Sequence, residues 1–413
     1  MTPDAFAQAL PDALDLAAAL DADGDGASNG AELAAGSDPN DTASAPGAGG
    51  DRCDGPVTGD WNVCTYDAVY VLKKIHLDVC GQSPTRAQVD AVRAAGDAMP
   101  LLHAALDACL DSENWRGKDG VVWRMAHTKI RPVQSIKAGE EDPGDIPLGD
   151  YFDDYAYFVY HHTDDRDARD LLLGNYFVAR TEGPDGTVYE PWDRSFREEL
   201  DVRGFGPAQL VVRSARVGML THRWFIMSNT MFTAIPRTTA AQAYRAYLGL
   251  DISKLEGLEP GLPLPEDYDN KGVRADACAV CHTTLDPLTY PFTRYEGIVV
   301  GNFREQLPFT YSPNRMQHYV DTDGPRVAET PEAGRILGQD VANLREWAQV
   351  AANSDAFAQA TVRDYWKVFM GEAPRDAEQA EFVALWQAFR GEHEYRVERM
   401  LHALIETEAY GVP

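Results

Sequence analysis

Residues 67–79 read DAVYVLKKIHLDV, and this stretch decides the fold class that we expect for the chain. Apolar side chains return every three or four positions, which is the spacing of one face of an α-helix. These residues are Val69, Leu72, Ile75, Leu77 and Val79. The segment GQSPT at 81–85 follows, and its Gly, Ser, Pro and Thr residues predict the end of one helix and the start of the next.

The same helical spacing of apolar residues recurs along most of the chain. We expect helices at 86–95, 100–110, 115–129, 151–160, 166–174, 207–228, 238–249, 339–352, 357–371, 376–390 and 395–409. Segments rich in Pro, Gly and acidic residues at 131–151 and 257–275 predict loops. Because clean strand alternation is rare, the sequence predicts a mainly α, multi-helix protein with long loops.

Composition and charge limit the classes of partner. Of the 413 residues, 44% are hydrophobic and 25% are charged, which is typical of a soluble globular protein. No run of about 18 apolar residues exists, so we expect no transmembrane segment. The net charge is −28, and residues 1–60 hold 12 acidic residues against the single Arg52. This charge argues against nucleic-acid binding and suits a cation or a basic partner, although it also fits a merely solvated acidic face.

The six cysteines fall into two groups. Two belong to a motif at 278–282, and the other four are Cys53, Cys64, Cys80 and Cys109. An even remainder fits two disulfides in an oxidising compartment, for which Cys53–Cys64 and Cys80–Cys109 are one of three possible pairings. Free buried cysteines are the alternative.

The motif Cys278-Ala279-Val280-Cys281-His282 is typical of covalent attachment of c-type haem. Two thiols at this spacing can bond to one edge of the haem while the adjacent imidazole ligates the iron. A chain of this composition would contain the pattern about 0.002 times by chance. A zinc site would need further Cys or His ligands, a thioredoxin-like dithiol would need a βαβ context, and a structural role is the remaining alternative.

Further haem ligands can be proposed only as candidates. His282 would be the proximal ligand, and His222 is our first candidate for the opposite face because its segment is apolar. The other candidates for that face are Met227, Met231, Met316 and His318, or none. Arg294 and Arg304 could pair with the haem propionates, although surface salt bridges explain them equally well.

The chain also resembles a known family over residues 67–410. The haem motif with TTLDP at 283–287, YEG at 295–297 and FR at 303–304 is similar to the haem-binding planctomycete-type cytochrome c domains. Segments at 73–85, 165–176, 216–222 with 236–237, and 357–410 resemble the domains of unknown function that accompany them, in the same order. The family usually continues Asp-Pro with Gly and a Leu-Glu-x-Phe-Asp stretch, which is altered here at 288–296. The resemblance implies export and haem attachment, but no substrate.

A second motif lies near the N-terminus. Residues 21–32, DADGDGASNGAE, match the calcium-loop pattern D-x-D-x-D-G-x5-E. The expected ligands are Asp21, Asp23, Asp25, the Ala27 carbonyl, Asn29 and Glu32. With GSDPND at 36–41, the loop resembles EF-hand loops and thrombospondin type 3 calcium repeats, and a disordered acidic tail is the alternative.

The pair His161-His162, close to Asp164 and Asp165, invites a metal interpretation. Adjacent residues on a helix point about 100° apart, so both rings rarely serve one ion. We expect a solvated helix end instead.

Together these features predict six regions. They are an EF-hand-like calcium loop segment at 1–35, a linker at 36–60, an N-terminal helical domain at 61–150, a middle helical domain at 151–275, a haem-attachment region at 276–335 and a C-terminal helical domain at 336–413.

The function that we expect is that of an exported monohaem c-type cytochrome, periplasmic or at the cell surface, that transfers electrons to or from a redox partner protein. A haem enzyme of peroxidase or oxygenase type with an open iron position, and a calcium-dependent surface binding protein with structural haem, are the alternatives. The N-terminus lacks the basic and apolar regions of a signal peptide, so export would need a signal already removed or another route.

Overall fold

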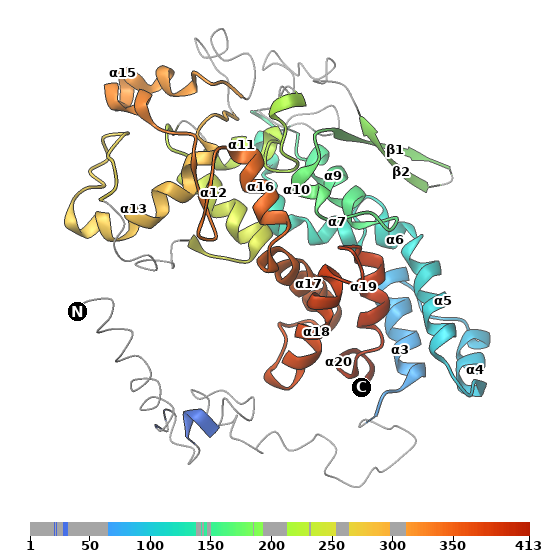
Figure 1. The fold of residues 1–413 in the computed structure, drawn as a ribbon. Coiled ribbons are helices and arrows are strands. Elements are labelled where there is room, and N and C mark those ends of the chain that lie inside the picture. Colours follow the sequence, from blue (N-terminus) through green and yellow to red (C-terminus); the bar gives the residue numbers. More distant parts are fainter. Residues whose placement is uncertain are drawn as a thin grey trace.

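The protein is described here from a computed structural model (Figure 1). The structure describes residues 20, 22, 28–31, 65–137, 142, 144–146, 150–184, 186–192, 213–230, 233–252, 264–297 and 311–413. Helices dominate, with two short antiparallel hairpins, so the mainly α prediction is confirmed. None of the described helices is long and apolar enough to cross a lipid bilayer.

The stretch that decides the fold class forms α3 (Ala68–Ile75), which runs on into a π-helical turn, η1 (His76–Cys80). The Asp67 carboxylate accepts hydrogen bonds from two backbone N–H groups of the first turn and so caps α3. The helix ends at Gly81, whose φ of 69° lies in the left-handed region that glycine adopts at little cost. Both helix ends therefore lie close to where the sequence places them.

A helical unit follows in the N-terminal third. It contains α4 (Arg86–Ala94), α5 (Met99–Leu110), α6 (Glu113–Arg116), α7 (Val121–Met125), α8 (His127–Ile130) and η2 (Gln134–Ile136). The single helix that we expect at 115–129 is wrong. A turn at 117–120 breaks it into short pieces, and Gly117 and Gly120 in this turn each lie too close to neighbouring backbone for a side chain.

The middle of the chain mixes helix and strand. It contains α9 (Phe152–His162), α10 (Asp170–Leu173), β1 (Phe177–Gly183), β2 (Gly186–Trp192), η4 (Arg213–Ala215), α11 (Arg223–Thr230), α12 (Arg237–Ala243) and the π-helical η5 (Tyr244–Leu248). The hairpin of β1 and β2 pairs in antiparallel register from Phe177 opposite Trp192 to Gly183 opposite Gly186. No strand is expected there from the sequence.

The last part begins with α13 (Asp276–Thr289), which carries the Cys-x-x-Cys-His motif. It continues with η7 (Tyr290–Phe292), η8 (Arg315–Tyr319), α15 (Val320–Asp323), η9 (Pro325–Glu329), β3 (Gly334–Ile336), β4 (Gln339–Val341), α16 (Leu344–Ala352), α17 (Asp355–Met370), η10 (Asp376–Glu378), α18 (Gln379–Arg390), α19 (Val397–Leu404) and α20 (Glu408–Gly411). The helix that we expect at 339–352 starts as strand β4 and becomes helical only after Asn343 caps α16.

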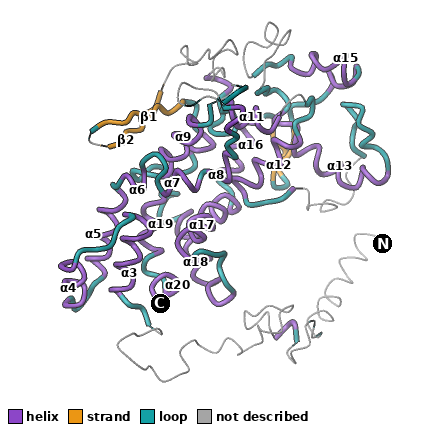
Figure 2. The backbone as a smooth tube through the Cα atoms, turned by 180° about the vertical axis from the view of Figure 1, so that it is seen from behind, coloured by secondary structure: helices purple, strands orange, loops and turns teal. Residues whose placement is uncertain are grey.

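One hydrophobic core joins helices from Val71 to Tyr410. Five tryptophans are almost completely buried in it, namely Trp115, Trp123, Trp224, Trp347 and Trp366. The two ends of this globular part meet, with α20 beside α3 (Figures 1 and 2), and the backbone N–H of Asp67 donates to the carbonyl of Gly411 over 3.0 Å. A smaller core under η8 and η9 contains Ala234, Met316, Tyr319 and Val327.

The adjacent histidines of α9 are buried, so the solvated helix end that we expect for them is wrong. His161 contacts the Tyr157 carbonyl through Nδ1 at 2.7 Å and the Tyr176 hydroxyl through Nε2 at 2.9 Å. His162 contacts the Tyr365 hydroxyl on α17 through Nδ1 at 2.8 Å. The two rings thus hold α9 to different elements, and burial lowers the pKa of His161 to about 3.

This burial predicts a specific loss of stability in acid. The pKa of His161 is lower in the folded chain than the ordinary value near 6.5, so its share of stability is complete above pH ~6.5 and falls as the pH drops toward 3. At pH 5 the loss reaches about 2 kcal/mol for this ring. We expect His161→Gln to reduce the fall in unfolding free energy between pH 7 and pH 5 by about that amount, measured by urea denaturation.

Tyr176→Phe is the matched control, because it removes one partner of the ring but leaves the histidine buried. It should keep the wild-type pH dependence. An equal fall in His161→Gln and the wild type would contradict the prediction.

Candidate haem-attachment site and calcium loop

Helix α13 presents both cysteines of the motif toward solvent. Cys278 is exposed and Cys281 is partly exposed, and neither sulfur forms a disulfide with any residue that the structure describes. Between them Ala279 is buried and Val280 is 57% exposed. One side of this turn therefore packs on the protein, while the thiols remain accessible to a reagent or a prosthetic group.

The imidazole of His282 has a hydrogen-bond partner at one of its two ring nitrogens. Its Nδ1 lies 2.8 Å from Oδ1 of Asp286, which follows one turn later on the same helix. The Asp286 side chain is fully buried, whereas the His282 side chain is 22% exposed. No described residue bonds to Nε2, so this nitrogen is available to a ligand.

A partly buried arginine, Arg237, fixes the carboxylate of Asp286. Arg237 at the start of α12 donates from Nε to Oδ1 of Asp286 over 2.7 Å and from Nη2 to Oδ2 over 2.9 Å. Its Nη1 donates to Oδ2 of Asp269 over 2.7 Å, and that carboxylate is also buried. Burial lowers the pKa of Arg237, but the hydrogen bonds and charges of the two carboxylates outweigh it and raise the pKa above its ordinary value.

This arrangement determines which nitrogen of His282 carries the proton. Both oxygens of Asp286 accept from the guanidinium of Arg237, as expected of an ionised carboxylate. The Nδ1 of His282 must then donate to Oδ1, which leaves the lone pair on Nε2. A ring with its second nitrogen bonded to a carboxylate is the usual form of a histidine that ligates a metal. The residues present thus fit an iron ligand at Nε2 of His282.

The first candidate for the opposite haem face, His222, lies in the protein interior. His222 is 2% exposed, its Nδ1 lies 3.2 Å from Oδ1 of Asp154, and it contacts the rings of Tyr157 and Phe177. Burial raises the pKa of Asp154 to about 6.

The remaining candidates are dispersed. Met227 is fully buried in the large core, Met316 belongs to the smaller core, and burial lowers the pKa of the partly exposed His318. Met231 lies outside the described residues. The sixth ligand therefore stays a prediction, with His222 as its first candidate.

Of the two arginines that we expect near the propionates, Arg294 lies among the described residues. Arg294 donates from Nη2 to the carbonyl of Thr330 over 2.8 Å, and burial lowers its pKa. Arg304 lies outside the described residues. A third arginine, Arg315, is wholly buried and donates to Glu296 over 2.9 Å and to the carbonyl of Ala234 over 2.7 Å. It ties η8 to the segments before α12 and after α13.

The calcium loop is described only in part. The side-chain oxygen of Asn29 accepts from the backbone N–H of Ala22 over 3.0 Å, and the N–H of Asn29 donates to the carbonyl of Leu20 over 2.6 Å. The chain therefore folds back on itself across the loop. The other expected ligands, namely Asp21, Asp23, Asp25, Ala27 and Glu32, lie outside the described residues.

Residues 21–42 match the family model of the bacterial TSP3 repeat. The match confirms the thrombospondin type 3-like resemblance of the loop, and the TSP3 repeat includes every residue of the expected calcium site. No curated protein and no solved structure matches the chain. The cytochrome resemblance of residues 67–410 therefore stays a prediction.

The three residues behind His282, namely Asp286, Arg237 and Asp269, are not among the site residues that we expect from the sequence. Asp286 could have been found, because it lies four residues after His282 and a helix brings such residues together. Arg237 is 49 residues before Asp286, and Asp269 lies in a loop with no pattern of its own. Nothing local in the sequence connects them, so their contact could come only from the tertiary structure.

The buried ion pairs predict a large cost when only the arginine is removed. We expect Arg237→Met to lower the unfolding free energy by about 3–5 kcal/mol, because two buried carboxylates would lose their compensating charge. Urea denaturation at pH 7 measures this loss.

Arg326→Met is the matched control. Arg326 is exposed and pairs with the exposed Glu266 over 2.6 Å, so its loss should leave the unfolding free energy almost unchanged. Equal effects of the two substitutions would show that the cluster of Arg237, Asp269 and Asp286 contributes no more to the unfolding free energy than an exposed ion pair does.

Proposed function

We propose that the chain is an exported monohaem c-type cytochrome that transfers electrons. The observation that carries the proposal is the state of His282. Its Nδ1 is bonded to a buried, arginine-paired carboxylate, its Nε2 is available, and it directly follows two accessible thiols on α13.

In this proposal each residue has a distinct task. Cys278 and Cys281 would hold haem through thioether bonds, and Nε2 of His282 would ligate the iron, which supplies one-electron redox chemistry when bound. Asp286 keeps the imidazole ring in one orientation and one tautomer. Arg237 and Asp269 keep Asp286 in place and compensate its charge.

The carboxylate also affects the strength of the ligand. A hydrogen bond from Nδ1–H of His282 to Asp286 makes the imidazole a stronger electron donor. Such a ligand stabilises the oxidised iron more than the reduced iron, so the reduction potential is lower than with a neutral partner. The same electron-rich ligand favours the second candidate function, a haem enzyme with an open iron position.

The TSP3 repeat and the disulfide support the location that we propose. Calcium is abundant outside cells, where it could fill even a weak loop at 21–32, and a disulfide persists in oxidising compartments. The net charge of −28 suits a basic redox partner. A calcium-dependent surface protein with structural haem is the third candidate, which the TSP3 repeat favours.

The deciding experiment is a visible spectrum of protein produced together with the cytochrome c maturation machinery. We expect a c-type spectrum, and haem that stays attached on a denaturing gel in the wild type but not in a Cys278→Ser, Cys281→Ser double variant. A reduced spectrum unchanged by carbon monoxide indicates a six-coordinate electron carrier. Rapid carbon monoxide binding indicates an open iron and the enzyme, and a lack of haem in the wild type would overturn both.

Asp286→Asn tests the role of the carboxylate with a readout other than activity. The variant should still attach haem, because both thiols and His282 remain. Its reduction potential should rise by tens of millivolts. The neutral amide accepts a weaker hydrogen bond from Nδ1–H of His282, so the imidazole becomes a weaker electron donor to the iron. An unchanged potential in redox titration would show that Asp286 only positions the helix.

The calcium proposal has its own test by isothermal titration calorimetry. We expect Ca²⁺ to bind the full chain, and Glu32→Gln to weaken the affinity by about tenfold or more, because the last loop position supplies two oxygens. Asp4→Asn removes one acidic charge outside the loop and should leave the affinity nearly unchanged. Equal affinities of the wild type and Glu32→Gln would reject the loop as the binding site.

A further inference from the structure

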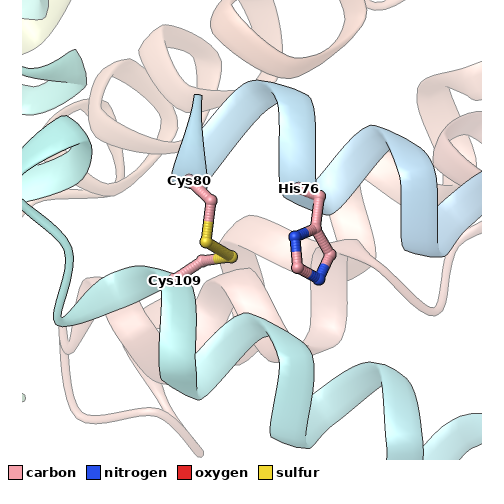
Figure 3. Close-up of side chains that lie close together, drawn as sticks. All are labelled: His76, Cys80 and Cys109. Atoms are coloured by element: carbon pink, nitrogen blue, oxygen red, sulfur yellow. A yellow bond between two sulfur atoms is a disulfide. The ribbon is translucent and has the colours of Figure 1, made fainter. Parts of the chain in front are cut away.

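A second group of reactive side chains lies at the junction of η1 and α5. Cys80 and Cys109 form a disulfide, as expected, and His76 lies beside it (Figure 3). One donor atom from each residue lies within 4.8 Å of the others, and among the described residues this is the one such group of three. Cys53 and Cys64, the other expected pair, lie outside the described residues.

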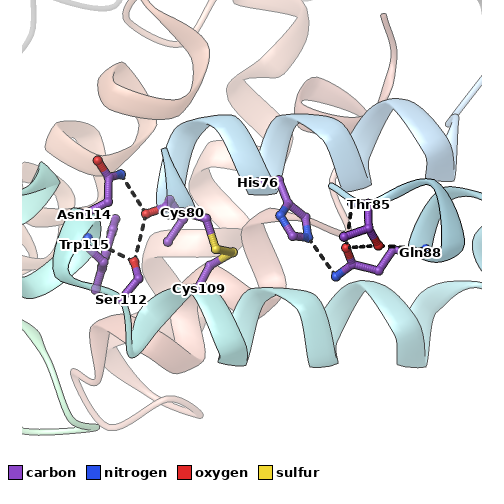
Figure 4. Close-up of a disulfide and its surroundings, with 9 residues drawn as sticks. His76, Cys80, Thr85, Gln88, Cys109, Ser112, Asn114 and Trp115 are labelled. Atoms are coloured by element: carbon purple, nitrogen blue, oxygen red, sulfur yellow. Dashed lines mark hydrogen bonds between the residues drawn. A yellow bond between two sulfur atoms is a disulfide. The ribbon is translucent and has the colours of Figure 1, made fainter. Parts of the chain in front are cut away.

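The histidine has an unusual environment. His76 is 7% exposed, and its Nδ1 is buried without a hydrogen-bond partner. A buried polar nitrogen without a hydrogen-bond partner lowers the stability of the fold, so its presence calls for an explanation. Figures 3 and 4 show one ring nitrogen on the disulfide side, while the other receives the contact from Gln88.

Gln88 determines which nitrogen of His76 carries the proton. Its Oε1 accepts from the backbone N–H and the hydroxyl of Thr85, both over 2.8 Å, in the capping box of α4. The amide nitrogen of Gln88 must then face His76, and it lies 3.2 Å from Nε2. Since that amide can only donate, Nε2 accepts and the proton of the neutral ring lies on Nδ1. Burial lowers the pKa of His76, in agreement with a neutral ring.

We propose that Cys80 and Cys109 form an exchange-active disulfide, whose thiolate form is stabilised by the Nδ1–H of His76. A disulfide sulfur is a weak acceptor, and the Nδ1–H has no partner in this form. A thiolate is a strong acceptor of a hydrogen bond. The ring therefore favours the reduced pair over the oxidised one.

The substrate would be a dithiol, and the exchange balances in two steps. A thiolate of the external dithiol attacks Sγ of Cys80, which belongs to the less buried of the two residues, and forms a mixed disulfide while the Cys80–Cys109 bond breaks. The electron pair leaves on Sγ of Cys109, beside His76. The second thiol of the donor then attacks the mixed disulfide and releases Cys80. Two electrons and two protons pass from the dithiol to the cysteine pair.

Cys80 lies next to an exposed segment of the chain. Cys80 ends the π-helical turn, and residues 81–83 after it are exposed. The carbonyl of Val79 accepts hydrogen bonds from Asn114 and Ser112, which fixes the backbone next to Cys80 (Figure 4).

Once reduced, the same three residues could in principle hold a soft metal ion. That alternative needs a lone pair on Nδ1 of His76, whereas the capping box places the proton there. The tautomer therefore favours exchange with a dithiol, and metal binding becomes an outcome of the test.

The test compares the full wild-type chain with His76→Leu in glutathione redox buffers. Alkylation followed by peptide mass spectrometry separates the peptides of Cys80 and Cys109 from the peptide of the haem motif. We expect the equilibrium constant for reduction to fall at least about tenfold in His76→Leu, which corresponds to about 30 mV. His103→Leu, also a histidine of this helical unit but paired with His402, should match the wild type.

A measurement on the wild type covers the case in which His76→Leu does not fold. The pH dependence of the alkylation rate of Cys80 or Cys109 in the reduced chain should show at least one thiol with about tenfold more thiolate at pH 7 than a free cysteine. An ordinary alkylation profile, or equal reduction of the wild type and His76→Leu, would overturn the proposal. One equivalent of Zn²⁺ bound by the reduced wild type but not by His76→Leu would also overturn it.

Discussion

The candidate haem site depends on one buried interaction, the fork of Arg237 on the carboxylate of Asp286. Without the guanidinium, a fully buried carboxylate inside α13 would be too costly to keep ionised. With it, the carboxylate can accept the proton of His282 Nδ1, and the ring presents Nε2 in one tautomer. Because Arg237 also binds Asp269, the same side chain holds the loop before α13 against the start of α12. Arg237 thus both holds the haem motif in position and, through Asp286, determines the tautomer of His282.

In two histidines of this chain, the hydrogen bond to one ring nitrogen determines whether the other nitrogen carries the proton, but the bonded groups differ. At His282 a carboxylate accepts from Nδ1 and leaves Nε2 with a lone pair, which suits a metal. At His76 the amide of Gln88 donates to Nε2 and leaves a proton on Nδ1, which suits a sulfur anion. The difference arises because Gln88 is already committed to the capping box of α4. A helix cap therefore decides the chemistry of a side chain twelve residues away.

Much of the helical fold could be predicted, since apolar spacing and capping residues act locally. The boundaries of α3 with η1 and of α4 agree closely with the sequence, because the side chains of Asp67 and Thr85 cap the starts of α3 and α4 and the left-handed Gly81 ends η1. The hairpin of β1 and β2 was missed because its faces are only partly buried and give weak alternation. The partners of His282 were missed because Arg237 and Asp269 reach it only through tertiary packing.

The meeting of α20 with α3 has a consequence for biosynthesis. The first helix of the globular part is completed by the last residues of the chain, since Asp67 bonds to Gly411 and the amino group of Lys74 lies 4.0 Å from the centre of the Tyr410 ring. A polypeptide still emerging from the ribosome cannot make these contacts until it has been synthesised as far as residue 411. Contacts this distant in sequence form slowly, so α3 and α20 are expected to join late in folding.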